Sequence, residues 1–190
     1  RLAAVVKPLA EKHHKTLERL KKEEKQLSRP DFLWHYMLQS FATLGSVRGW
    51  DGLIGNEENY AKVTYEALSK LSADRRLSRL EKTLLKAKVR MPYKKADWLA
   101  ENFDRIEEMG GPEAAKKALL RQPNRNEKIK FLKAFAGIGD KYARNIMMDV
   151  YHPDFRDSIA IDARIEGITE MLGLEFGRYE EQERFYVEAA

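Results

Sequence analysis

A primary amine and a carboxylate stand at two points of this chain where each would open a helix. Lys141 follows the run Gly137-Ile138-Gly139-Asp140, and Asp162 stands before Ala163. A lysine amine is nucleophilic only in its neutral form, which a helix N-terminus and partial removal from water both favour. A nearby carboxylate would stabilise positive charge that develops at the attacked carbon. The two residue types so placed are suited to covalent catalysis, in which a neutral amine attacks a carbon atom.

The two glycines before Lys141 predict a sharp turn between two helices. Gly137 and Gly139 can adopt backbone angles that other residues avoid. Without side chains in the way, their amides and the first turn of the next helix can face a phosphate oxygen, which the helix dipole also favours. Ile138 would be the apolar plug beneath the turn. A tight turn that binds no ligand explains the glycine pair alone equally well.

The segments 135–145 and 159–165 resemble the helix-hairpin-helix, loop and aspartate signature of the DNA glycosylase superfamily, which includes endonuclease III and 8-oxoguanine DNA glycosylase. In bifunctional members of that family, the catalytic lysine stands two residues after the second hairpin glycine, where this chain has Lys141. The catalytic aspartate opens the helix after the loop, where this chain has Asp162. The resemblance implies that the lysine attacks C1′ of the deoxyribose and expels the base.

Both catalytic candidates have a simpler interpretation. Lys141 also fits a solvated lysine that touches phosphate, and Asp162 fits a helix N-cap, the commonest role of aspartate at such a position. We prefer catalysis because both residues fall on the two catalytic positions of one motif. The preferred partner is double-stranded DNA with a damaged base, bound by a monomer that needs no cofactor.

The resemblance also narrows the substrate. A lysine-containing member without an iron-sulfur cluster is most similar to the 8-oxoguanine branch, so an oxidised guanine is the favoured substrate. Oxidised pyrimidines and alkylated bases are alternatives within the superfamily. A noncatalytic helix-hairpin-helix module that only binds DNA is the alternative outside it.

A glycosylase extrudes its target base into a pocket, for which aromatic side chains are natural walls. The candidates for this pocket are Trp34, Trp50, Gln182, Phe185 and Tyr186. Gln182 and Tyr186 have the spacing of one helix face. They resemble the glutamine that reads the base and the aromatic that stacks on it in 8-oxoguanine glycosylases. Core packing is the alternative for the aromatics, and a surface position is the alternative for Gln182.

Further DNA contacts are expected from cationic side chains. Arg144 would meet phosphates beside the glycine turn, and Arg48, in a glycine-rich loop, would fill the vacated stack or contact the orphaned base. The resemblance also implies a monovalent cation at the backbone carbonyls of Lys133, Phe135 and Ile138. The four histidines lack the spacing of a metal site, so we expect no transition metal.

The composition limits the classes of protein to consider. With 190 residues the chain can bury a sizeable core, and its formal charge of +5 suits an anionic partner. The absence of cysteine excludes disulfides, thiolate zinc sites and iron-sulfur clusters. No apolar stretch approaches the ~20 residues that span a bilayer, and no secretory leader is evident. We therefore expect an intracellular protein that does not enter a membrane.

Helical spacing dominates the whole chain, and Gly and Pro fall between the periodic segments, so we expect an all-α fold of two packed helical halves with a cleft between them. Residues 30–150 would form a barrel-like half with the hairpin, and 1–29 and 151–190 the other half. The segment 32–44 is apolar almost all round, as in a helix at the centre of a bundle. A first helix over 2–27 would bury Leu9, Leu17, Leu20 and Leu27.

Overall fold

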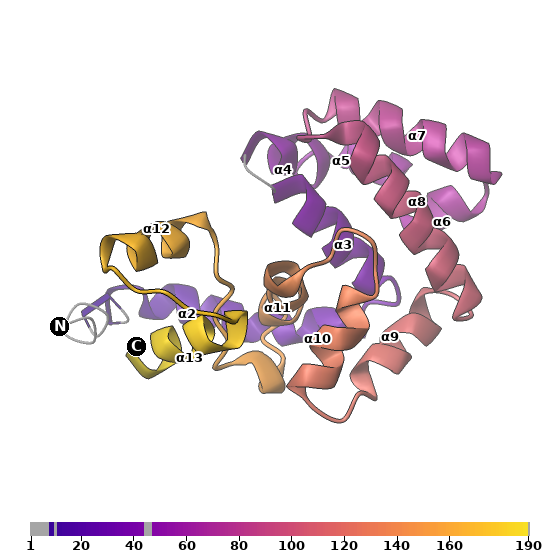
Figure 1. Ribbon diagram of the computed structural model, residues 1–190. Helices are drawn as coiled ribbons and strands as arrows, with labels where there is room; N and C mark the ends of the chain where they lie inside the picture. The colour runs from indigo at the N-terminus through magenta and orange to yellow at the C-terminus, as the bar shows by residue number, and fades with distance from the viewer. Residues whose placement is uncertain (1–7, 10, 44–46, 190) are drawn as a thin grey trace. The chain divides into compact units, whose positions relative to one another are not determined.

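The computed structural model describes residues 8–9, 11–43 and 47–189 (Figure 1). No strand occurs among these residues, which confirms the predicted all-α fold. They divide into two compact units. One combines the described part of Arg1–Leu27 with Gly139–Ala190, and the other is Ser28–Ile138. The segment 139–150, expected in the larger half, belongs to the smaller unit.

The larger unit is built from eight helices in the described chain. They are α3 (Phe32–Thr43), α4 (Val47–Leu53), α5 (Glu57–Lys62), α6 (Tyr65–Ser69), α7 (Ala73–Lys86), α8 (Pro92–Glu108), α9 (Pro112–Leu120) and α10 (Arg125–Lys133). Helix α3 contacts α4, α8 and α9, and α7 packs along α8 (Figure 1). The prediction that 32–44 is a central helix is confirmed, because α3 buries side chains on all its faces.

Local sequence signals set the ends of several of these helices. Helices α8 and α9 each begin at a proline, whose missing N–H is not needed in the first turn. Helix α10 begins at Arg125, after Asn124, whose side chain accepts a hydrogen bond from the Glu127 amide at 3.1 Å.

One lysine of α8 is completely buried. The Lys95 ammonium donates to the Phe41 carbonyl at 2.6 Å, near the C-terminus of α3, where helix carbonyls lack partners. Burial lowers the pKa of Lys95 to about 8. The lysine therefore joins α8 to the end of the central helix.

The smaller unit contains α2 (His14–Lys21), α11 (Asp140–Met148), α12 (Ala163–Met171), α13 (Tyr179–Ala189) and two short 3-10 segments, η1 (Lys22–Ser28) and η2 (Pro153–Phe155). Within the predicted helix over 2–27, residues 8–9 and 11–12 are helical, a turn follows at His13, and α2 and η1 come next. The predicted start lies outside the described residues. Leu9, predicted to be buried, is 47% exposed. The side chains of Leu17 and Leu20 lie outside the described parts, and Leu27 is half-buried.

No helix in the described chain combines the length and apolar character needed to cross a bilayer.

Candidate active site

The turn before α11 has the backbone expected of the glycine pair. Gly137 has a φ of +77°, and the Ile138 amide donates to the Phe135 carbonyl at 3.1 Å. Ile138 is buried, as predicted for the plug of the turn. A Cβ on Gly137 would lie 2.6 Å from the Trp98 ring, so the glycine is also required for packing.

Gly139 differs from Gly137 in both respects. Its φ is −100°, which any residue can adopt, and a Cβ there would meet no atom within 4 Å. It is exposed and forms the N-cap of α11. The start of α11 is therefore open to a ligand, with the positive end of the helix dipole behind it.

Lys141 lies in the first turn of α11, as predicted, and is half-buried. Its Nζ atom lies 5.2 Å from the centre of the Tyr142 ring. Burial raises the pKa of Tyr142 to about 12, so this ring stays a neutral phenol at physiological pH. The amine is thus held beside an uncharged aromatic surface and remains partly accessible.

Asp162 is the N-cap of α12. Its Oδ1 atom accepts hydrogen bonds from the Arg164 amide at 2.9 Å and the Ile165 amide at 3.1 Å. The structural interpretation of this aspartate is therefore confirmed. Its Oδ2 atom makes no hydrogen bond to the described residues, so this oxygen could contact a ligand without breaking the N-cap hydrogen bonds.

A buried arginine ties α11 to α13. Arg144 is 1% exposed, and its Nε donates to Glu183 Oε2 at 2.8 Å while Nη1 donates to the Asp140 carbonyl at 3.1 Å. Its guanidinium lies 4.2 Å from the centre of the Tyr179 ring and 3.7 Å from the Glu180 carboxylate. This arginine cluster is made of Asp140, Arg144, Tyr179, Glu180 and Glu183.

The arginine cluster also holds the segment that leads into α12. Glu183 Oε1 accepts from the Ile159 amide at 3.2 Å, and the Tyr179 hydroxyl accepts from the Ile161 amide at 2.6 Å. Burial raises the pKa of Tyr179 to about 12, so the hydroxyl keeps its proton.

One cluster therefore fixes the main chain beside both catalytic candidates. Asp140 directly precedes Lys141, and Ile161 directly precedes Asp162. Arg144 donates to the Asp140 carbonyl and lies over the Tyr179 ring, whose hydroxyl accepts the Ile161 amide. The main chain beside each candidate is therefore held by one connected set of contacts. Sequence reasoning missed Tyr179 and Glu183, although their i, i+4 spacing on one helix could have suggested a common face.

The structure gives Arg144 an internal role in place of the expected phosphate contact. A guanidinium that is almost completely buried and paired with carboxylates cannot reach a phosphate without breaking those pairs. Among the predicted DNA contacts, the backbone of Gly139 is exposed, whereas the Ile138 side chain is buried.

The five candidates for the base pocket lie in different units. Trp34 is in the core of the larger unit, where its indole N–H donates to the Val63 carbonyl at 2.8 Å and its ring meets Tyr65 and Phe103 edge-on. It is therefore a core residue and not a pocket wall. Trp50, on α4, is 37% exposed.

The other three candidates belong to α13 in the smaller unit. Gln182 is buried and donates to Thr169 Oγ1 at 2.9 Å, and the Tyr186 hydroxyl lies 2.7 Å from the same Thr169 oxygen. Phe185 is half-buried and packs against Phe176 and Tyr186. The helix thus brings Gln182 and Tyr186 to one face, as their spacing predicted.

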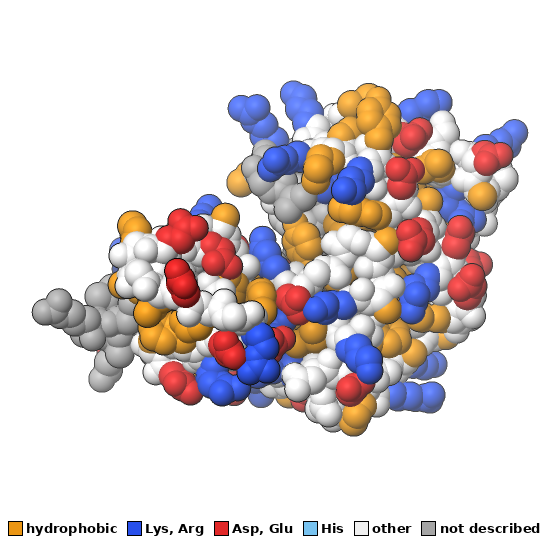
Figure 2. All heavy atoms as spheres, in the orientation of Figure 1, with side chains coloured by type: hydrophobic (Ala, Val, Ile, Leu, Met, Phe, Trp, Pro, Cys, Tyr) orange, Lys and Arg blue, Asp and Glu red, His pale blue; other side chains and the backbone are white. Residues whose placement is uncertain are grey.

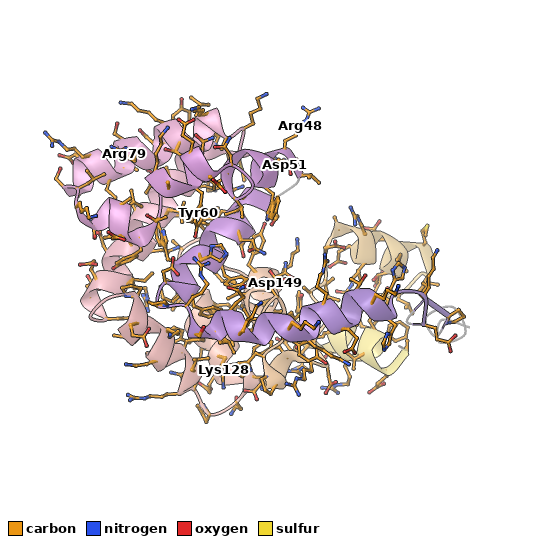
Figure 3. All side chains as sticks on the ribbon, turned by 180° about the vertical axis from the view of Figure 1, so that it is seen from behind. Arg48, Asp51, Tyr60, Arg79, Lys128 and Asp149 are labelled. Atoms are coloured by element: carbon orange, nitrogen blue, oxygen red, sulfur yellow. The ribbon has the colours of Figure 1, made fainter. Side chains whose placement is uncertain are left out.

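Arg48 lies on an exposed surface of the larger unit where cations and apolar side chains alternate. This α4 surface comprises Val47, Arg48, Trp50, Leu85, Lys88, Arg90, Met91, Tyr93 and Lys94. Helix α4 lies against the segment that follows α7, since a Cβ on Gly49 would lie 3.4 Å from Val89 Cα. Lys and Arg side chains intermix with hydrophobic ones over α4 and α7 in Figure 2, and Arg48 projects outward from α4 in Figure 3.

The carbonyl of Phe135, one of the three expected to hold a monovalent cation, accepts the Ile138 amide. Among the described residues, no group of three or more His, Cys, Asp or Glu side chains is placed to hold a metal ion.

Comparisons with protein-family models, curated proteins and solved structures found no match for this chain. The function is therefore argued from the site.

Proposed function

We propose that this protein is an intracellular, monomeric DNA glycosylase and abasic-site lyase that removes an oxidised base from double-stranded DNA, with 8-oxoguanine the favoured base. The supporting observation is the arginine cluster, in which Arg144 holds the main chain beside Lys141 and Tyr179, packed against Arg144, holds the main chain beside Asp162.

The proposed reaction proceeds by covalent catalysis. The neutral Lys141 amine forms a bond to C1′ as the glycosidic C1′–N bond breaks, and the base leaves with that electron pair and takes up a proton. Opening of the sugar ring gives the Schiff base. Removal of a C2′ proton then breaks the C3′–O bond, and the 3′ phosphate leaves. Asp162 Oδ2 would stabilise positive charge on the sugar.

DNA binding would use the backbone and the α4 surface. The exposed start of α11 at Gly139 offers amides and a helix dipole to one phosphate. The cations of the α4 surface would meet further phosphates, and its exposed apolar side chains would meet bases. The net charge of +5 favours the same partner.

A noncatalytic DNA-binding module is the second candidate, because Asp162 already has a structural role as an N-cap. Within the glycosylases, an oxidised pyrimidine or an alkylated base remains an alternative substrate. The two classes differ in one property, since only an enzyme with a Schiff base forms a reducible covalent bond to DNA.

Borohydride trapping on duplexes that each carry a single lesion tests the proposal. We expect a covalent protein–DNA complex with the wild type and none with Lys141→Gln. Lys130→Gln, which removes an exposed lysine from α10, is the matched control and should trap normally. Failure of the wild type to trap any lesion or abasic duplex that it binds would contradict the lyase. Base release without trapping would indicate a monofunctional enzyme.

A further inference from the structure

One face of α8 lies along the chain that leads into the glycine turn. Trp98, Asn102 and Arg105 are three or four positions apart, so they share this face of the helix. In that order they contact Gly137, Ala136 and Phe135. All of these residues belong to the larger unit. Successive side chains of α8 therefore contact successive residues of the turn.

Asn102 makes the hydrogen bonds of this face. Its Nδ2 atom donates to the Ala136 carbonyl at 3.0 Å, and its Oδ1 atom accepts from the Ala136 amide at 2.7 Å. The side chain is completely buried. The reverse orientation of the side-chain amide would set donor against donor and acceptor against acceptor. The two bonds therefore fix Asn102 and Ala136 relative to each other.

Ala136 lies outside the helices that could otherwise supply these bonds. Helix α10 ends at Lys133, and Ala136 stands between that end and Gly137. A main-chain group that is removed from water without a partner is costly, and here one side chain satisfies both groups of one residue. An apolar side chain in place of Asn102 could fill the space but would leave both Ala136 groups unpaired.

The ring of Trp98 supports the next residue of the turn. A Cβ on Gly137 would lie 2.6 Å from the Trp98 ring and 2.9 Å from the Phe41 ring. The centres of these two rings are 5.8 Å apart. The turn thus rests on two aromatic rings at Gly137 and is held by Asn102 one residue earlier.

This support bears on DNA binding, because the turn would bind a phosphate through its main-chain amides. Such amides attract a phosphate only when they point toward it together. Ordering a loose turn during binding costs conformational entropy, and a turn that is ordered beforehand avoids that cost. Helix α8 is a firm support, since it packs along α7 and is joined to α3 through Lys95.

We propose that Asn102 is a positioning residue, which holds Ala136 so that the amides of the glycine turn are oriented for a DNA phosphate before DNA binds. Asn102 acts through the main chain and does not touch DNA, because its side chain is buried. The inference rests on the proposed binding of DNA at this turn and not on the covalent reaction of Lys141.

Asn102→Ala removes both bonds, and its binding to an undamaged duplex tests the role. We expect the affinity to fall about tenfold or more at every salt concentration, because hydrogen bonds to a charged phosphate are lost. The slope of log K against log salt should change little, since main-chain amides carry no charge that displaces counterions. Tyr65→Phe, which also loses a buried hydrogen bond of the larger unit, should bind like the wild type. Wild-type affinity in Asn102→Ala, shown to be folded by circular dichroism, would overturn the proposal.

Asn102→Asp gives a second test through pH. A neutral carboxylic acid has an acceptor and a donor, as the amide has, so it can make both bonds to Ala136, whereas the ionised carboxylate cannot donate. We expect this variant to bind the duplex like the wild type near pH 5 and about tenfold more weakly than the wild type near pH 8. Equal weakening at both pH values would contradict the role of the donated bond.

These tests separate this inference from the proposed reaction. Failure of the wild type to trap DNA would contradict the lyase and leave the positioning role intact, because binding to undamaged duplex requires no reaction. Undiminished binding by folded Asn102→Ala would overturn the positioning role and leave the lyase intact. A wild type that binds no duplex would overturn both.

Discussion

The hydroxyl of Tyr179 accepts the Ile161 amide at 2.6 Å, one residue before Asp162. The face of the same ring carries the guanidinium of Arg144, 4.2 Å from the ring centre. One aromatic side chain therefore joins the start of α12 to the side chain that holds the start of α11.

Tyr179→Phe removes the acceptor and keeps the ring. The Ile161 amide then lacks its partner, at a cost of about 1–3 kcal/mol in the free energy of unfolding. We expect a lower single-turnover rate of Schiff-base formation on lesion DNA with unchanged DNA affinity. Tyr65→Phe, which removes the hydroxyl that donates to Glu107 in the larger unit, is the control for stability alone and should react normally. Equal rates for Tyr179→Phe and the wild type would contradict the positioning role.

The two hairpin glycines should differ sharply when each is replaced by alanine. Gly137→Ala requires a left-handed φ of +77° and puts a Cβ 2.6 Å from Trp98 and 2.9 Å from Phe41. We expect a loss of roughly 2–4 kcal/mol in unfolding free energy, measured by urea denaturation. Gly139→Ala meets no atom within 4 Å and should change stability by less than about 1 kcal/mol. Similar losses for both would contradict this account of the turn.

Local signals predicted much of this fold. The all-α class, the buried α3, the position of Lys141 in a first turn and Asp162 as an N-cap follow from periodicity and capping residues. The role of Arg144 could not be predicted, because it depends on Glu183, which is 39 residues away. The predictions that Trp34 lines a pocket and that Leu9 is buried were wrong for a related reason. Burial of a side chain depends on which distant elements cover it, and helical spacing does not contain that information.

Asp149 at the end of α11 should make stability depend on pH. Burial raises the pKa of Asp149 to about 6 from its ordinary 3.8 (the residue is labelled in Figure 3). The folded state then binds the proton more tightly than the unfolded state, so this group's stabilisation is present below pH 4 and is lost as the pH rises through 6. Asp149→Asn should therefore be more stable than the wild type at pH 7.5 by about 1–3 kcal/mol and similar to it near pH 4. Thermal unfolding at both pH values measures this, and a difference of the same size at both would contradict it.

The α4 surface should contribute salt-dependent DNA affinity. Arg48→Ala and Lys94→Ala should each weaken binding to undamaged and damaged duplexes alike and lower the slope of log K against log salt by about 1. Lys70→Ala removes an exposed lysine of the same unit that is paired with Glu66, and should change the slope little. Fluorescence anisotropy over a range of salt concentrations gives these slopes. Unchanged slopes for Arg48→Ala and Lys94→Ala would show that the α4 surface does not contact DNA phosphates.

The two oxygens of the Asp162 carboxylate have separate surroundings, since Oδ1 accepts both amides at the start of α12. An asparagine can supply the same carbonyl to those amides while it carries no charge. Under the proposed mechanism, we expect Asp162→Asn to fold correctly and to bind lesion DNA without reacting, which would allow the complex before bond breakage to be crystallised.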